Sequence, residues 1–321
     1  MARIGDDLSP RESHETPSRG ILLKVLSVMV FMIMASLVKA TSEVVPPGEA
    51  VFFRSFFAVP VILVWLLATR ALGSGLRTAN PLGHFWRGLM GTCAMGCGFA
   101  GLGLLPLPEV TALGYASPLL TVIFAAMFLG EDVRLFRIFS VALGLAGVLL
   151  ILSPRLTVSG AGGVSHGEAL GAIVVLSGAV FSALAQVFVR KLVTEERVTA
   201  IVFYFSVNSA LLSLVTLPFG WALPDAATAA MLVVAGLLGG VGQVLLTSSY
   251  RYADASVVAP FEYSSILLAL AIGYVVFGEA PTTVVIGGSA LVIVAGMLII
   301  WREARLGLDR DRQRRAMTPQ G

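Results

Sequence analysis

Runs of about 20 apolar residues recur along almost the whole chain and limit the fold more than any other feature. An α-helix rises about 1.5 Å per residue, so each run is long enough to cross the hydrocarbon core of a membrane. A closed β-barrel would need alternating polar and apolar residues, which the runs lack. The sequence therefore predicts an all-α integral membrane protein with ten transmembrane helices, at about residues 21–40, 48–68, 86–105, 108–129, 134–152, 168–189, 199–218, 227–249, 255–277 and 283–301.

The composition agrees with a membrane location. Of the 321 residues, 57% are hydrophobic and 13% are charged, which is too little polar surface for a soluble core of this size. The net charge of +3 does not indicate nucleic acid, because the basic residues lie in the breaks between apolar runs and near the C-terminus. We therefore expect membrane lipid around the chain and no nucleic-acid partner, while a homodimer is left open. Cys93 and Cys97 are interpreted as small buried residues of one helix face.

An internal repeat divides the apolar runs into two sets of five. The pairs that match under a shift of 148 residues, the difference between 115 and 263, are Gly88 and Gly236, Gly91 and Gly239, Tyr115 and Tyr263, Ser117 and Ser265, and Glu131 and Glu279. Five crossings per copy is an odd number, so the second copy must enter the membrane upside down relative to the first. The predicted fold is therefore two inverted five-helix repeats.

Charge placement orients the chain. With the N-terminus in the cytoplasm, nearly all lysines and arginines between the runs fall on the cytoplasmic side, and Arg155 falls on the other, as the positive-inside rule requires. The prediction is a multi-pass protein of the bacterial cytoplasmic (inner) membrane with both termini cytoplasmic. Its parts are a disordered cytoplasmic tail at 1–20, a first repeat at 21–152, a periplasmic linker at 153–167, a second repeat at 168–301 and a basic cytoplasmic tail at 302–321.

Polar residues inside the runs are the candidates for function, since they are costly in hydrocarbon. Glu262 lies well inside the ninth run, where an unpaired acid costs about 2.5 to 3.5 kcal/mol. We predict that it binds a cation or a proton, the alternative being a buried partner that holds it for packing. Tyr115 and Tyr263 are predicted to form an aromatic or polar wall.

Three side-chain amides complete the predicted solute-binding set. Gln186 and Gln243 are candidates for hydrogen bonding to a solute, and Asn208 shares a helix face with Tyr204. Bonds between packed helices explain these amides equally well.

Gating is predicted at the ends of the first two runs and at two prolines. Lys39 and Arg54 lie near the outer face, with Glu43 and Glu49 close by in sequence, so a cluster of ion pairs there would suit a gate. Snorkelling to lipid headgroups is the alternative for Lys39. Arg54 is predicted either to take part in gating or to bind an anionic group. Pro118 and Pro260 interrupt the fourth and ninth runs and are predicted to bend them.

Sequence motifs exclude several functional classes. The chain has no zinc-protease, phosphate-loop or nucleophile-elbow motif and no paired Cys-x-x-Cys units. We therefore expect no enzyme activity, no catalytic residue, no cofactor and no metal site. The missing phosphate loop also argues against a pump with its own ATPase. His166 is interpreted as a solvated histidine of the linker.

The chain resembles the drug/metabolite transporter superfamily, in particular its ten-helix EamA-type members. The resemblance rests on the FFRSFF segment at 52–57, the Tyr115-Ala-Ser-Pro118 segment, the span ends LGE at 129–131 and FGE at 277–279, and the two five-span halves. It implies alternating access around a central cavity lined by both halves, and solutes such as amino acids, riboflavin-like vitamins, adenosyl-methionine-like metabolites or drugs. The second half departs from the pattern, because its proline precedes the tyrosine.

The predicted function is that of a secondary active transporter that moves a small organic metabolite across the cytoplasmic membrane by alternating access. Two alternatives remain, a small-solute channel and a non-transporting membrane scaffold. A channel would show flux that does not saturate, and a scaffold would bind no solute.

Overall fold

The computed structural model describes residues 17–70, 72–129, 135–156, 166–193, 195–253 and 255–317, and this part of the chain contains helices and no strand. The helices are α1 (Pro17–Thr41), α2 (Pro47–Phe56), α3 (Ala58–Ala68), α4 (Leu72–Gly75), α5 (Pro81–Leu104), α6 (Leu107–Gly114), α7 (Ala116–Leu129), α8 (Leu135–Leu156), α9 (His166–Leu192), α10 (Val198–Ser213), η1 (Leu214–Phe219), α11 (Ala226–Tyr252), α12 (Ala255–Val258), η2 (Ala259–Tyr263), α13 (Ser264–Phe277) and α14 (Thr283–Met317).

Eight helical segments of the described residues are long and apolar enough to cross a membrane. They are Ser18–Thr41, Pro47–Ala68, Leu107–Phe128, Gly167–Leu192, Val198–Phe219, Ala226–Tyr250, Ala259–Phe277 and Thr283–Arg302. The apolar part of α8, Ile138–Ser153, is shorter. The remaining predicted run forms α5, a helix of 24 residues, in which many glycines and Arg87 lower the apolar content.

Local sequence explains where several helices start and stop. The Asn80 side chain accepts a hydrogen bond from the N–H of Gly83 at 2.9 Å at the start of α5, and Asp225 accepts one from Thr228 at 3.0 Å at the start of α11. Both are favoured N-cap residues. α13 ends at Phe277 and is capped by Gly278, whose φ of 67° lies in the left-handed region that glycine adopts without cost.

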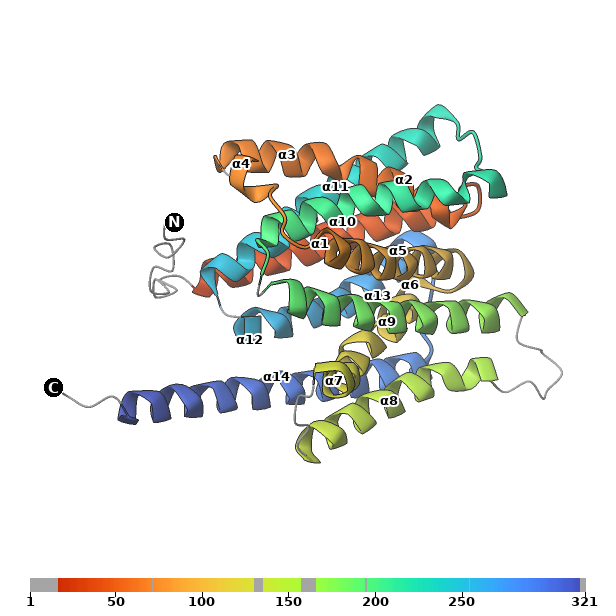
Figure 1. Ribbon diagram of the computed structural model, residues 1–321. Helices are drawn as coiled ribbons and strands as arrows, with labels where there is room; N and C mark the ends of the chain where they lie inside the picture. The colour runs from red at the N-terminus through yellow and green to blue at the C-terminus, as the bar shows by residue number, and fades with distance from the viewer. Residues whose placement is uncertain are drawn as a thin grey trace.

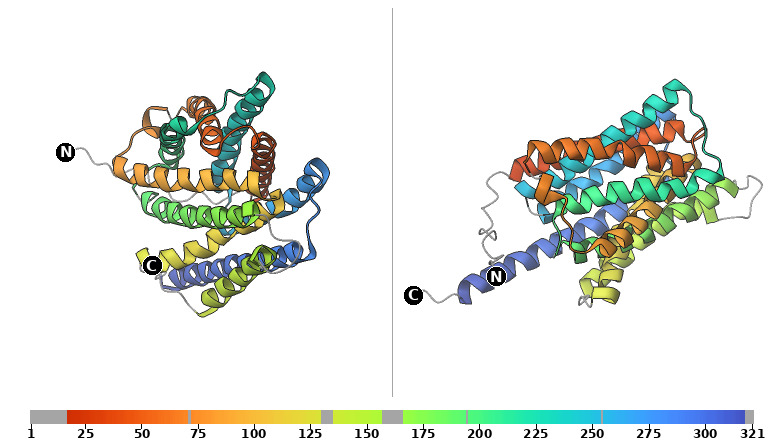
Figure 2. Two further views of the ribbon diagram at one scale, coloured as in Figure 1. Left: turned by 90° about the vertical axis from the view of Figure 1, so that its right-hand side faces the viewer. Right: turned by 45° about the horizontal axis from the view of Figure 1, so that its top comes forward.

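Long helices pack side by side in pairs. α1 runs along α11, α5 runs along α9, and α8 runs along α14 (Figure 1). The α8 and α14 backbones approach closely at two glycines, since a methyl group at Gly147 would lie 2.8 Å from the carbonyl oxygen of Gly288. Figure 2 shows α8 and α14 on one side of the bundle, with α5 and α9 forming the next layer.

The distribution of apolar residues fits a bundle surrounded by lipid. Val38, Leu113 and Ile266 are almost fully buried in the core between helices. Leu67, Phe128 and Val275 are more than half exposed, and such residues cover the outside of the bundle. An apolar exterior of this extent is typical of a membrane-embedded protein.

Some helix boundaries differ from those predicted. α1 begins at Pro17 rather than at residue 21, and α14 continues to Met317, beyond the predicted span end at 301. α9 begins at His166, within the predicted linker. Residues 1–16, 130–134 and 157–165, which include the Gly130-Glu131 span end, lie outside the described residues. Helices extend past their apolar cores because the apolar run marks the membrane-buried part and not the end of backbone hydrogen bonding.

Candidate functional site

Among the cavities of the described part of the chain, two share Gln186 of α9 as a lining residue. The larger has a volume of about 480 Å³ and is bounded by residues of α1, α2, α5, α6, α9 and α10. The smaller has a volume of about 250 Å³ and is bounded by residues of α7, α9, η2 and α14. Small-molecule sites typically have volumes of about 300 to 1,000 Å³. The larger cavity is therefore of the right size for a small organic solute.

Broken helices form one wall of the smaller cavity. α6 ends at Gly114 and α7 begins at Ala116, which leaves Tyr115 between the two helices. Pro118 has no N–H for the carbonyl group of Gly114, so the helix cannot continue through this point. In the second half, Pro260 lies inside the 3-10 helix η2.

The two tyrosines at these breaks contact each other. The rings of Tyr115 and Tyr263 stack with centroids 4.7 Å apart and planes at 25°. The Tyr115 hydroxyl donates to the carbonyl oxygen of Glu262 at 2.6 Å and lies 2.7 Å from the Ser265 hydroxyl. Stacking thus joins two equivalent tyrosines of the predicted repeats, and hydrogen bonds join Tyr115 to the neighbours of Tyr263, on the wall of the smaller cavity.

Glu262 has a partner within the protein. Its carboxylate lies 3.2 Å from the ammonium group of Lys24, whose side chain is 2% exposed, while the Glu262 side chain is 54% exposed. Lys24 lies about two turns after the start of α1, so its side chain lies within the helix bundle and not in the segment before the helix. A buried ammonium group needs an opposite charge. Glu262 supplies that charge and at the same time lines the smaller cavity.

Two arginines line the larger cavity. Arg54 of α2 and Arg87 of α5 both contact the ring of Phe205 in α10, with their guanidinium carbons 5.7 and 3.6 Å from its centroid. Arg54 is 6% exposed. Each cation–π contact of a desolvated arginine contributes up to about 2 kcal/mol.

A polar contact closes the bundle where α1, α5 and α13 end. The Lys39 ammonium group lies 2.8 Å from Glu279 and donates to the carbonyl oxygens of Leu102 and Leu105 at 3.0 and 2.8 Å. Glu279 also accepts the N–H of Leu107 at 2.8 Å. Lys39 therefore pairs with the second half of the chain rather than with Glu43 or Glu49, because the turn after α13 lies against the end of α1. We call Lys39 and Glu279 the Lys39 clamp.

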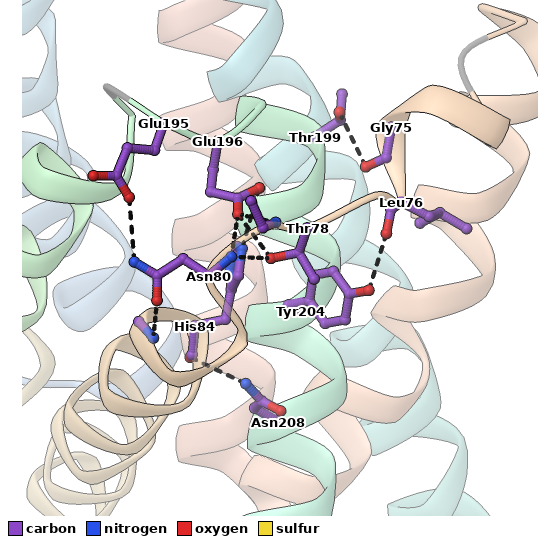
Figure 3. Close-up of polar contacts among 12 residues, drawn as sticks. Gly75, Leu76, Thr78, Asn80, His84, Glu195, Glu196, Thr199, Tyr204 and Asn208 are labelled. Atoms are coloured by element: carbon purple, nitrogen blue, oxygen red, sulfur yellow. Dashed lines mark hydrogen bonds and ion pairs between the residues drawn. The ribbon is translucent and has the colours of Figure 1, made fainter.

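The opposite end of α5 carries a second polar contact between distant loops, drawn in Figure 3. One oxygen of Glu196 accepts from the Thr78 hydroxyl at 2.8 Å and from the N–H groups of Ala79 and Asn80 at 2.7 and 2.8 Å. The other oxygen lies 3.7 Å from the imidazole of His84. Burial raises the pKa of Glu196, whereas these hydrogen bonds and the nearby His84 lower it. The lowering effects together are larger, so the pKa lies below its ordinary value. We call these residues the Glu196 clamp.

Two predicted solute-binding residues lie away from both cavities. The Asn208 amide donates to the carbonyl oxygen of His84 at 3.0 Å and so joins α10 to α5 (Figure 3). Gln243 of α11 is not among the residues that line either cavity. For Asn208 the structure therefore favours the helix-packing alternative.

Sequence reasoning missed Arg87, Lys24 and Glu196. Arg87 is not among the candidates for function, although it lies inside the predicted run 86–105 and one turn before Gly91 on the same face of α5, and that spacing was the available signal. Lys24 lies inside the predicted run 21–40, which was its signal, but its partner Glu262 is 238 residues away. Glu196 carries no local signal. Among the described residues, no group of three His, Cys, Asp or Glu side chains is placed to hold a metal ion.

A helical bundle with an apolar exterior and a solute-sized cavity between its helices is the architecture of a membrane transport protein. The EamA-like transporter family model matches residues 18–153 and again 169–301, so the chain belongs to that family. It is a multi-pass inner-membrane transporter of the drug/metabolite type and not an enzyme.

Relatives with different solutes match nearly the whole chain. The Pseudopaline exporter CntI of Pseudomonas aeruginosa is 32% identical over 283 residues, which cover 86% of this chain and 94% of the relative. A riboflavin transporter of Rhizobium johnstonii is 30% identical over 310 residues, 93% of this chain and 97% of the relative. An S-adenosylmethionine uptake transporter of Rickettsia prowazekii is 26% identical over 294 residues, 92% and 96% of the two chains.

A solved crystal structure shares the fold. It is 22% identical in sequence and superimposes with a TM-score of 0.62, covering 90% of this chain and 99% of the other. This match concerns the fold alone.

Proposed function

We propose that the protein is a secondary active transporter that moves a small organic metabolite across the inner membrane by alternating access. One observation carries this proposal. A cavity of about 480 Å³, lined by helices from both halves of the chain, lies between two polar clamps at opposite ends of α5. α5 has 24 residues, so at about 1.5 Å per residue the clamps are separated by roughly the thickness of a hydrocarbon core.

The proposed architecture has ten crossings in two inverted repeats, 21–152 and 168–301, joined by a periplasmic linker at 153–167. The packing supports it. In such a duplication α1 corresponds to α9, and α5 corresponds to α11. The α1–α11 and α9–α5 pairs are then equivalent contacts that the repeat relates to each other. Contact between the equivalent Tyr115 and Tyr263 is expected where a pseudo-two-fold axis passes between them.

The proposed orientation has both termini in the cytoplasm. The start of α1 and the end of α14 lie at the same end of the bundle in Figure 1. The Glu196 clamp is then cytoplasmic and the Lys39 clamp periplasmic. In this arrangement Lys39 acts as part of the outer gate, and the breaks at Pro118 and Pro260 allow the broken helices to bend as the clamps open.

The proposed solute site combines the two cavities. Gln186 is exposed and lines both cavities, so it is placed to bond a solute in either. Tyr115 and Tyr263 supply the aromatic wall. Glu262 supplies a negative charge that a solute cation or a proton can reach in competition with Lys24, and such competition is a means of coupling binding to gate opening.

Counterflow in proteoliposomes tests the function. The purified protein is reconstituted and loaded with unlabelled riboflavin, S-adenosylmethionine or a mixture of amino acids, and uptake of the labelled solute is followed. A carrier shows saturable uptake that is stimulated by the internal solute. Flux that does not saturate and shows no counter-exchange indicates a channel. Absence of flux with every solute, together with no thermal stabilisation by any, indicates a scaffold.

The Glu262→Gln variant tests the role of the acid. If Glu262 binds a cation or proton, the variant loses most transport and the dependence of its residual rate on pH. Unchanged rates across pH at normal expression would remove Glu262 from the mechanism.

A further inference from the structure

The larger cavity holds two positive charges for which the described residues supply no counterion. Arg54 and Arg87 line it from α2 and α5. Of the ion pairs within the described part of the chain, those that reach the bundle interior involve Lys24, Lys39 and His84, and none includes either arginine. Two cations therefore face one cavity without a carboxylate between them.

Several hydrogen-bond donors of these arginines also lack an acceptor. An arginine carries five N–H donors and keeps its charge at physiological pH. Within the described residues, Nε of Arg54 and both Nε and Nη1 of Arg87 are buried and have no hydrogen-bond partner. Buried donors are normally satisfied, so acceptors are expected from a molecule that enters the cavity.

The surrounding backbone leaves room for both guanidinium groups. A methyl group at Gly91 would lie 2.7 Å from Nη1 of Arg87, and one at Gly239 would lie 3.1 Å from Nε of Arg54. Gly91 and Gly239 are equivalent under the shift of 148 residues. The same glycine position in each half therefore accommodates one of the two arginines.

Packing against the aromatic ring does not account for this arrangement. The face of Phe205 attracts both cations, but it offers no acceptor to the N–H groups at the guanidinium edges. Two like charges around one ring also repel each other. An anion between them would satisfy the donors and cancel the repulsion.

We propose that Arg54 and Arg87 bind a carboxylate group of the transported solute, an inference that rests on the proposed transport function. Guanidinium forks match the two oxygens of a carboxylate. The body of the solute then lies against Phe205 and the apolar wall, and its other end reaches Gln186. A phosphate has more oxygens than a carboxylate and needs more hydrogen-bond donors. Besides the two arginines, Ser182 and Gln186 are the only polar side chains among the described residues that line this cavity, so the site fits a carboxylate better.

Thermal melts of the full-length protein in lipid nanodiscs test the proposal. The probes are matched pairs that differ in the carboxylate, namely phenylalanine with phenylalaninol, phenylacetate with 2-phenylethanol, and glutamate with glutamine, together with inorganic phosphate. We expect the carboxylate member of a pair to raise the melting temperature at concentrations at which its neutral partner does not.

Substitutions assign the effect to the two arginines. Arg54→Gln and Arg87→Gln should each weaken binding about 10- to 100-fold, since each removes hydrogen bonds to a charged group. Arg54→Lys should retain part of the affinity, because it keeps the charge and loses the fork. Arg197→Gln, which removes an exposed arginine before α10, is the matched control and should bind as the wild type does.

Ligand-free stability gives an independent readout. Each of Arg54→Gln and Arg87→Gln removes a buried charge that has no counterion. Without ligand, the melting temperature of each variant should therefore equal or exceed that of the wild type. The proposal is overturned if neutral partners stabilise as well as carboxylates, if phosphate alone stabilises, or if both variants melt several degrees lower while no carboxylate stabilises the wild type.

The result is separable from the transport function. Carboxylate binding without any flux in the counterflow assay would refute transport and leave the site standing. Saturable transport of a neutral solute at the wild-type rate by Arg54→Gln and Arg87→Gln would refute the site and leave transport standing.

Discussion

Removing the charge of Lys39 is expected to open the end of the bundle at which α1 ends. Its ammonium group makes an ion pair and two hydrogen bonds to backbone carbonyls, all between 2.8 and 3.0 Å. The side chains of Lys39 and Glu279 are 12% and 17% exposed, so little water replaces these bonds in the closed state. Lys39→Met and Glu279→Gln each leave the other partner buried without its counter-charge.

The magnitude follows from the burial of the pair. Loss of one partner of a fully buried pair costs about 3 to 5 kcal/mol, and the residual exposure reduces this to about 2 kcal/mol. If the clamp forms only in the closed state, this cost shifts the closed-to-open ratio about 30-fold toward open, at about 1.4 kcal/mol per factor of ten.

Thiol labelling measures the shift. Ser182 lines the larger cavity, so Ser182→Cys in a background of Cys93→Ala and Cys97→Ala reports access to it. A membrane-impermeant maleimide added from the side of the Lys39 clamp should label this cysteine about 10 to 30 times faster in either clamp variant.

Glu43→Gln is the matched control, because Glu43 is an exposed acid in the turn after α1. The reasoning is refuted if the clamp variants label no faster than the parent protein. It is refuted equally if Glu43→Gln accelerates labelling as much as Glu279→Gln does.

Three further predictions concern stability. Tyr115→Phe removes both bonds of the hydroxyl and should lower the melting temperature by several degrees, whereas Tyr263→Phe should change it little; equal losses would contradict the role given to the Tyr115 hydroxyl. The pKa of Glu196 lies below its ordinary value, so its stabilising contribution is complete above the pKa of the unfolded carboxyl, about 4.3, and is lost as pH falls through the lowered pKa. The melting temperature of the wild type should therefore fall more steeply than that of Glu196→Gln below about pH 4.3, and parallel curves would count against the Glu196 clamp. Gly91→Ala should destabilise the protein, because its methyl group would meet the Phe205 ring and Arg87 at 2.7 Å. Gly96→Ala in the same helix meets nothing within 4 Å and should be neutral or gain up to about 1 kcal/mol, so equal melting temperatures would refute the close approach at Gly91.

A glycine that lines the smaller cavity, Gly296, also influences the site through packing. Gly296 of α14 accepts the Tyr263 ring so closely that any side chain at this position would overlap the Tyr263 hydroxyl. The stacked tyrosines therefore depend on a glycine in the last long helix. No pattern in the sequence around Gly296 predicts this contact with Tyr263.

The sequence by itself determined the membrane class, the apolar spans and the interruptions at Pro118 and Pro260. These properties are local, because a span needs only a run of apolar residues and an interruption needs only a missing N–H. The shift of 148 residues also predicted that Tyr115 and Tyr263 are equivalents, and Gly91 and Gly239 likewise, since a duplication would leave its trace in residue identity.

Only the tertiary structure decided which polar groups meet. Lys24 and Glu262 are 238 residues apart, and no local pattern connects them. The same holds for the Lys39 clamp, for the two arginines beside Phe205, and for Asn208, which turns toward His84 instead of the cavity. Contacts of this kind depend on the rotation of each helix about its axis and on the angle at which it crosses its neighbours, and the close packing of many side chains along both helices determines these together.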